Sequence, residues 1–261
     1  MDYIVNPTTS DLLVVNDHPL VNCNTPSDTA TFQNNFHVAS NSTTLAWFQT
    51  RLETSGSGKI LPSRLSRGVG MAKLFISLGL TGRGAEVGVW KGEFSKDVLL
   101  NIPQLEHYTL VDPWRHIEGW NKPFNDIHDE EFEEIYQQAL QTVNQWQHKV
   151  TVLRTTSLEA ASQITNASLD FVYLDGDHTL TGISVDMALW YDKVKPNGVL
   201  CGDDYVDIAN QKQDAPIVSN SDNAEHNYEP TMVKPFVDLF GHAKGIPIFD
   251  LGKRQFCLVK L

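Results

Sequence analysis

Four carboxylate side chains follow two predicted strands at the points where those strands end. Asp175 and Asp177 come directly after the first of these strands, and Asp203 and Asp204 come directly after the second. One crossover of helical length joins the two strands, which predicts that they run parallel with their carboxyl ends at the same edge of a sheet. Four negative charges at one edge repel each other strongly unless a cation or a positively charged ligand lies among them. The pattern therefore predicts a site for a positive charge.

The rest of the chain alternates short apolar runs with stretches of helical periodicity. Apolar residues at helical spacing predict helices over 65–76, 132–146, 179–194 and 232–240. Strands are predicted over 84–89, 108–111, 150–153, 169–174 and 198–201, followed by a terminal pair over 246–249 and 256–259. This alternation is typical of a parallel, doubly wound α/β sheet, which binds its ligands at the carboxyl ends of the strands.

The length of 261 residues suits one α/β domain with an appendage. Residues 1–60 are rich in Asn, Thr, Ser and Asp and have little periodicity, so we expect an irregular N-terminal extension. Residues 61–261 are expected to form the main domain. Two insertions, near 113–130 and 205–230, emerge at the same edge as the four carboxylates, and we expect them to act as lids.

The composition narrows the range of partners. The formal net charge of −12 at pH 7 disfavours nucleic acid, because nucleic-acid binding depends on basic surface. The chain has no apolar run of membrane-spanning length and no signal-peptide pattern at its start, so we expect a cytoplasmic protein without a membrane partner. The cysteines Cys23, Cys201 and Cys257 are odd in number and far apart, which argues for reduced thiols rather than a disulfide. A homo-oligomer is compatible with these features.

A turn that contains two glycines follows the first predicted strand. Gly88 and Gly92 let the backbone pass close beneath a ligand, and the helix that follows offers free N–H groups. Their spacing differs from the Gly-x-Gly-x-x-Gly pattern of dinucleotide sites, and Trp90 would crowd a pyrophosphate. Glu86 suits an ammonium group better than a phosphate, and Asp112, after the second strand, could accept both hydroxyls of a ribose. Together these residues predict a site for a positively charged nucleoside, and S-adenosylmethionine has that combination.

Residues 84–205 resemble the class I S-adenosylmethionine-dependent methyltransferases, in particular the family that includes the magnesium-dependent macrocin-type sugar O-methyltransferases. The segments 172–178 (VYLDGDH) and 195–205 (KPNGVLCGDDY) carry most of the resemblance, together with Asp186, Leu189 and Trp190 between them. The resemblance implies a Rossmann-like fold, with a doubly wound, seven-stranded, mostly parallel sheet and an antiparallel last strand.

The resemblance also implies positions for the cofactor. Glu86 and Gly88 would lie beside the methionine part, Asp112 beside the ribose, and Thr156 or Ser157 beside the adenine. For Thr156 and Ser157 the alternative is that they only cap a helix. The full predicted cofactor-binding set is Glu86, Gly88, Trp90, Gly92, Asp112, Thr156, Ser157 and Asp175.

At the acidic edge, the resemblance implies a magnesium ion bound by Asp175, Asp203 and Asp204. Such an ion would lower the pKa of an acceptor hydroxyl and fix its geometry. Asp177 is the expected general base, and His178 is the second candidate. The alternatives are that Asp177 only caps the next helix, that His178 supports the site from its edge, and that Asp203 and Asp204 are polar loop residues in a chain that binds no metal.

The predicted function is therefore metal-assisted, S-adenosylmethionine-dependent O-methylation of a small hydroxylated molecule, such as a sugar or a phenolic metabolite. Two other hypotheses are a non-catalytic cofactor-binding or assembly protein with the same fold, and a nicotinamide-dependent Rossmann oxidoreductase. The presence of every expected acidic residue disfavours the first alternative, and the glycine spacing disfavours the second.

Overall fold

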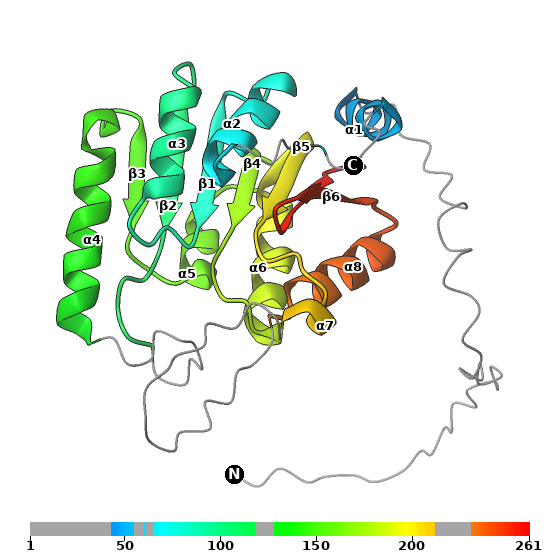
Figure 1. Ribbon diagram of the computed structural model, residues 1–261. Helices are drawn as coiled ribbons and strands as arrows, with labels where there is room; N and C mark the ends of the chain where they lie inside the picture. Colours follow the sequence, from blue (N-terminus) through cyan, green and yellow to red (C-terminus); the bar gives the residue numbers. More distant parts are fainter. Residues whose placement is uncertain (1–42, 55–59, 61–64, 118–127, 212–230) are drawn as a thin grey trace, which may run out of the picture. The chain divides into compact units, whose positions relative to one another are not determined.

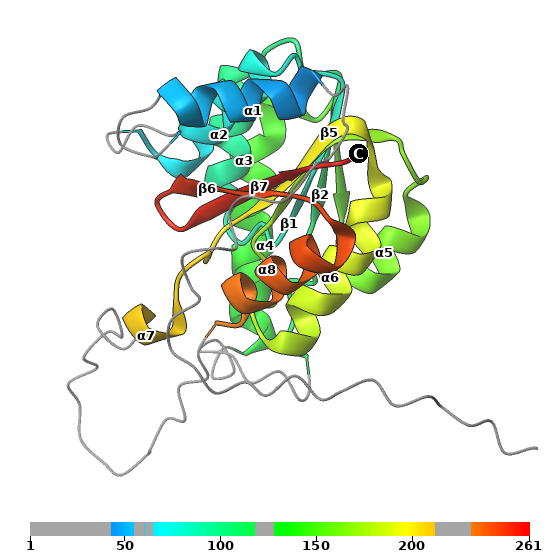
Figure 2. The same ribbon diagram turned by 90° about the vertical axis from the view of Figure 1, so that its right-hand side faces the viewer.

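The computed structural model describes residues 43–54, 60, 65–117, 128–211 and 231–261. Residues 1–42 lie outside the described residues, as do 118–127 and 212–230, which make up most of the two insertions expected to act as lids. The role of those insertions therefore remains a prediction. Figures 1 and 2 show the fold from two directions.

The described residues form one seven-stranded sheet with the strand order β3-β2-β1-β4-β5-β7-β6. The strands are β1 (Arg83–Val87), β2 (His107–Val111), β3 (Val150–Leu153), β4 (Leu169–Leu174), β5 (Val194–Gly202), β6 (Ile248–Gly252) and β7 (Gln255–Val259). Neighbouring strands from β3 to β5 pair in parallel, whereas β7 runs antiparallel to both β5 and β6. This arrangement confirms the predicted Rossmann-like fold with an antiparallel last strand.

Helices cover both faces of the sheet, as Figures 1 and 2 show. One face carries α1 (Thr43–Thr54), α2 (Arg67–Ser77), α3 (Glu93–Asn101) and α4 (Asp129–Val143), the last followed by a short 3₁₀ turn (Asn144–Trp146); the other carries α5 (Ser157–Gln163), α6 (Leu180–Lys193) and α8 (Val233–Lys244). A short α7 (Ile208–Gln211) follows β5. Side chains alternate across a strand, so Phe171 and Tyr173 of β4 enter the first core, while Val172 and Leu174 enter the second.

Helix α1 lies within the stretch predicted to be irregular, and that prediction is wrong for residues 43–54. Its Phe48 is fully buried and stacks on Phe249 of β6, with ring centroids 4.4 Å apart. The Thr44 hydroxyl donates a hydrogen bond of 2.8 Å to the carbonyl of Asn197. The helix has little apolar periodicity of its own, so packing against the sheet edge stabilises it more than its sequence does.

The expectation of reduced thiols is also wrong for two cysteines. Cys201 of β5 and Cys257 of β7 lie opposite each other in the antiparallel pair, with Cα atoms 4.0 Å apart, and form a buried disulfide. A separation of 56 positions conceals this proximity in the sequence. Cys23 lies outside the described residues.

Among the described residues, no helix combines the length and the apolar character that a membrane span requires.

Candidate active site

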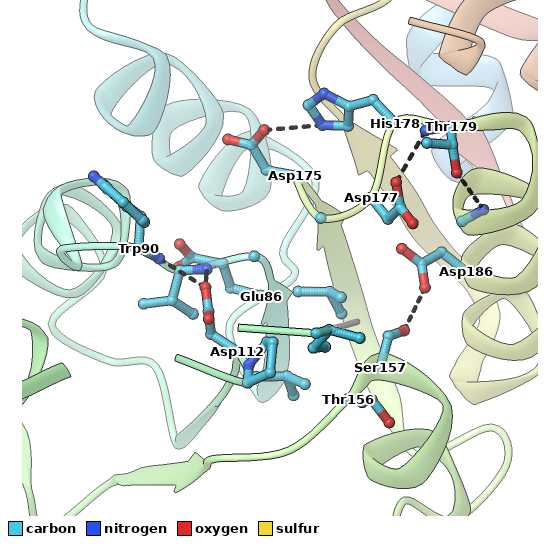
Figure 3. A pocket seen from close by; sticks show the side chains of 18 of the residues that line it. Glu86, Trp90, Asp112, Thr156, Ser157, Asp175, Asp177, His178, Thr179 and Asp186 are labelled. Atoms are coloured by element: carbon cyan, nitrogen blue, oxygen red, sulfur yellow. Dashed lines mark hydrogen bonds and ion pairs between the residues drawn. The ribbon is translucent and has the colours of Figure 1, made fainter. Parts of the chain in front are cut away.

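A cavity of about 750 Å³ lies at the carboxyl ends of β1, β2 and β4, beside the start of α6 (Figure 3). This volume falls within the usual range for cofactor sites. The predicted site residues that line it are Glu86, Gly88, Trp90, Asp112, Thr156, Ser157, Asp175, Asp177, His178 and Asp204. Gly92 and Asp203 do not line the cavity, although both were predicted to belong to the site.

Gly88 lies where the turn after β1 meets the end of β4. Its φ is +88°, and a Cβ atom at this position would clash with the backbone of Asp175. The Gly88 N–H donates a hydrogen bond of 2.9 Å to Val111 of β2, so the turn is held between its two neighbouring strands. Only glycine fits this contact. By contrast, Gly92 has a φ of +77° at the N-cap of α3, where it serves the turn rather than the cavity wall.

Glu86 is a buried carboxyl group in β1. Its Oε2 accepts hydrogen bonds from the Ser95 hydroxyl at 2.7 Å and from the Tyr108 hydroxyl at 3.0 Å. Burial raises the pKa of Glu86 to about 8, and the two hydrogen bonds only partly oppose this effect. The side chain therefore carries a proton through much of the neutral range in the absence of a positive ligand.

Asp112 holds two loops together at the end of β2. Its Oδ2 accepts hydrogen bonds from the backbone N–H groups of Val89 and Trp90, both at 3.0 Å, and its Oδ1 accepts one from the N–H of Trp114 at 2.9 Å. The Trp114 indole in turn donates to the carbonyl of Trp90 at 2.8 Å. Trp90 has a φ of +55°, and these contacts hold it in that uncommon conformation.

Thr156 and Ser157 begin α5 at the opposite wall. Thr156 forms a capping box with Glu159, so the predicted alternative of helix capping holds for it. The Ser157 hydroxyl donates to Oδ1 of Asp186 and accepts from the indole N–H of Trp190 at 2.8 Å. Asp186 is buried in α6 and also lines the cavity. The sequence places Asp186 in the helix that shares the family resemblance, but it predicts no role in the site for this residue.

The acidic edge contains a cation that the sequence did not reveal. Arg67, the first residue of α2, places its Nη1 3.2 Å from Oδ2 of Asp175 and in contact with Oδ2 of Asp203. Burial lowers the pKa of Arg67, but the surrounding acidic groups, led by Asp175, together outweigh this effect and the net shift is upward. The guanidinium therefore stays charged and neutralises part of the acidic cluster.

The third predicted metal ligand, Asp204, contacts two further cationic side chains. Its Oδ2 lies 2.7 Å from Nδ1 of His178, and its Oδ1 lies 2.7 Å from Nη2 of Arg254. Burial raises the pKa of Asp204, but His178, Arg254 and Arg67 together more than offset it and the net shift is downward. Nε2 of His178 lies 3.4 Å from Oδ1 of Asp175, too far for a good hydrogen bond (Figure 3). Burial lowers the pKa of His178, but the two carboxylates raise it to about 9.

Asp177 stands at the entrance to α6. Its Oδ1 accepts a hydrogen bond of 3.0 Å from the N–H of Thr179, and Thr179 itself caps the helix through the N–H of Gly182 (Figure 3). Gly182 leaves room for the Asp177 side chain, because a Cβ there would clash with it. The alternative prediction that Asp177 caps the helix is therefore wrong, because Thr179 is the N-cap; Asp177 instead accepts a hydrogen bond from the capping residue and lines the cavity.

The described residues do not fit the magnesium ion that was predicted. No group of three His, Cys, Asp or Glu side chains among them converges in a way that could hold a metal. Asp175 and Asp203 face Arg67, and both oxygens of Asp204 face His178 and Arg254. Oδ1 of Asp203 is buried without a hydrogen-bond partner among the described residues, but one such oxygen is not a magnesium site.

Comparisons with known proteins bear on the fold and on the kind of domain. Residues 85–205 match the family described as "Methyltransferase domain". No curated protein matches the sequence. A structure from Staphylococcus aureus, described as that of a candidate caffeoyl-CoA O-methyltransferase, is 12% identical with a TM-score of 0.53, and the alignment covers 84% of this chain and 92% of that one.

A second structure, an SAH-bound methyltransferase from Podospora anserina, is 11% identical with a TM-score of 0.50; the alignment covers 84% of this chain and 86% of that one. At these identities the two likenesses show the fold alone. The family match adds the kind of domain, and it spans the turn after β1 and both acidic strand ends. Residues 85–205 therefore match a methyltransferase domain, and the described residues around them form a Rossmann-like sheet.

Proposed function

We propose that this chain transfers the methyl group of S-adenosylmethionine to a hydroxyl group of a small molecule. The observation that carries the proposal is that Glu86, in β1 just before the glycine turn, and Asp112, directly after β2, line one cavity. Of the two similar structures, one is described as an O-methyltransferase and the other is bound to SAH, which supports the reaction class and the cofactor.

In this proposal the cofactor spans the cavity from β1 to α5. Its ammonium and sulfonium charges lie toward Glu86, whose proton would leave when a cation binds nearby. Its ribose lies toward Asp112 and its adenine toward Ser157, while Gly88 lets the backbone approach the ligand closely. Asp175 lies at the reacting end, beside the acidic cluster.

Methyl transfer forms a bond from the acceptor oxygen to the methyl carbon while the carbon–sulfur bond breaks, and the electron pair of that bond stays on sulfur. The hydroxyl proton must pass to a base. We assign the base role to Asp177, which lines the cavity. His178 is a weaker candidate, because both of its ring nitrogens face carboxylate oxygens.

The acceptor is proposed to be a sugar or a phenolic metabolite, since a cavity of this size accepts small molecules beside a cofactor. A cytoplasmic location and the absence of nucleic-acid and membrane partners stay predictions, as does a homo-oligomer. The predicted magnesium ion is not part of this proposal, because the side chains that would bind it pair with Arg67, His178 and Arg254.

Calorimetric titration with S-adenosylhomocysteine tests the proposal. We expect the full chain to bind this product. Asp112→Asn should bind it at least about tenfold more weakly, because the amide NH₂ group cannot accept the backbone N–H hydrogen bonds that a carboxylate oxygen accepts. Asp192→Asn, at an exposed position of α6 outside the cavity lining, serves as the matched control and should bind like the wild type. Folded protein that binds NAD but not S-adenosylhomocysteine would instead support the oxidoreductase hypothesis.

A further inference from the structure

The acidic cluster is occupied by a side chain whose position several separate contacts fix. The Ser66 hydroxyl caps α2 by accepting from the N–H of Val69 at 3.3 Å, and it donates to Asp97 of α3 at 2.6 Å. Just before the helix, the carbonyl of Leu65 accepts a hydrogen bond from the Lys253 ammonium group in the β6–β7 turn. Arg67 follows directly, so its backbone is anchored by contacts with α3 and with the β6–β7 turn.

Close packing of α2 on α3 adds to this anchoring. Gly68 lies against Asp97, and a Cβ atom at position 68 would clash with the Asp97 side chain. The start of α2 therefore approaches α3 more closely than a larger residue would allow. Both anchors direct Arg67 to the ends of β4 and β5, where Asp175 and Asp203 emerge.

Cationic side chains offset most of the negative charge at this edge. Arg67 and Arg254 bring two permanent positive charges to Asp175, Asp203 and Asp204, and His178 lies between Asp175 and Asp204. A divalent cation that bound Asp175 and Asp203 would have to displace the guanidinium and would meet its repulsion at close range.

We infer that Arg67 takes the place of the divalent cation at this site, so that the chain needs no resident metal for methyl transfer. This inference rests on the proposed function. A guanidinium has five N–H donors, and the recorded contacts with Asp175 and Asp203 use Nη1. About half of the Arg67 side chain is exposed, at 46%, and it lines the cavity. Its other N–H groups can donate to the acceptor oxygen, which a metal would otherwise bind and orient.

Titration of the full chain with Mn²⁺, after treatment with a chelator, tests the inference. The electron paramagnetic resonance signal of free Mn²⁺ reports binding without any need for an acceptor. We expect weak binding to the wild type, and binding at least about tenfold tighter to Arg67→Met, because this change removes the cation and keeps an unbranched side chain of useful length. Arg67→Lys should bind as weakly as the wild type, since it retains the charge.

Two further variants make the result specific to this cluster. Adding Asp203→Asn to Arg67→Met should abolish the gain in Mn²⁺ affinity, whereas Arg83→Met, at the opposite end of β1, should not change it. One equivalent of Mn²⁺ bound to the wild type as tightly as to Arg67→Met would overturn the inference, and so would the absence of any gain in folded Arg67→Met. The titration is repeated with saturating S-adenosylhomocysteine. If S-adenosylhomocysteine does not bind, the proposed function fails. If the wild type binds both S-adenosylhomocysteine and Mn²⁺ tightly, only the inference about Arg67 fails.

Discussion

At the β1 and β2 end of the cavity, the carboxyl groups of Glu86 and Asp112 receive hydrogen bonds from hydroxyl groups and backbone amides. At the β4 and β5 end, Asp175, Asp203 and Asp204 instead contact arginine and histidine side chains. A neutral donor stabilises a carboxylate without cancelling its charge, whereas an ion pair cancels it. The first end can therefore offer negative charge to a cationic cofactor, from Asp112 and from Glu86 once Glu86 has lost its proton, whereas the second end carries its own counter-charges.

The comparison also shows why similar acidic residues in a sequence can have different roles. Asp112 is the first residue after β2 and Asp204 is the second after β5, and neither position alone indicates whether the partner is an amide or a cation. The partner comes from elsewhere in the chain: Trp114 lies two residues after Asp112, but Arg254 lies 50 residues after Asp204. Sequence reasoning can find the acids, but it cannot find the distant groups that determine their charge.

The largest expected effect comes from Gly88→Ala, at the contact between the two ends. The added methyl group would clash with the Asp175 backbone, and φ at this position is +88°. We therefore expect the free energy of unfolding to fall by more than about 3 kcal/mol, or S-adenosylhomocysteine binding to be lost altogether. Urea unfolding and calorimetry measure the two quantities.

Gly79→Ala is the matched control, because Gly79 also has a positive φ, +71°, but has open space around it. It should cost only about 1 kcal/mol and leave ligand binding unchanged. Equal effects of the two substitutions would show that backbone conformation, and not the contact with β4, is what position 88 requires.

A smaller effect, with a distinct pH dependence, is expected for Glu86→Gln. The pKa of Glu86 is about 8 in the folded chain, against 4.5 for an ordinary glutamate, so the folded state holds the proton more tightly between these values. The stabilisation that the bound proton of Glu86 contributes is complete below about pH 4.5 and is lost as the pH rises toward 8. Relative to Glu86→Gln, the wild type should therefore lose up to about 1.4 kcal/mol per pH unit in this window.

Urea unfolding of both proteins at several pH values between 5 and 8 measures this difference. If the two stability curves run parallel, Glu86 does not titrate as the buried carboxyl group described above. Glu86 would then no longer support the contrast between the end of the cavity with neutral hydrogen-bond donors and the end with ion pairs.

The smallest effect is expected for Arg254→Ala at the acidic end. The Arg254 side chain is 45% exposed, and Asp204 keeps its contact with His178, so we expect a loss of at most about 1 kcal/mol in urea unfolding. Arg83→Ala provides the baseline for an exposed arginine outside the site. A loss of several kcal/mol would mean that Arg254, rather than Arg67, is the main counter-charge of the cluster.

Much of the sheet could be predicted, because its signals are local. The predicted bounds 150–153 and 169–174 agree with β3 and β4, where short apolar runs end in polar residues. By contrast, β5 begins at Val194 rather than near 198, because Val194 pairs with Leu169 across an irregular register that the sequence does not reveal. Helix α1 was missed since its order depends on packing against Asn197 and Phe249.

The site could be predicted only where residues lie at strand ends. Glu86, Asp112 and Asp175 line the cavity as expected, whereas Arg67 was missed because its position depends on how α2 packs on α3. One signal was available: Ser66 precedes a helical run and is a good N-cap, which would have placed Arg67 at a helix start. Even so, only the packed fold brings that helix start to the acidic edge.

The hydrogen bonds of Asp112 have a consequence for how a ligand would enter. Because its carboxylate already fastens the backbone at Val89, Trp90 and Trp114, the floor of the cavity is shaped before anything arrives, and association should demand little additional ordering of the chain. The Asp112 carboxylate thus orders the binding site in advance and would also accept hydrogen bonds from the ribose. Replacing it should slow capture as well as hasten release, a double kinetic signature that loss of a simple contact would not produce.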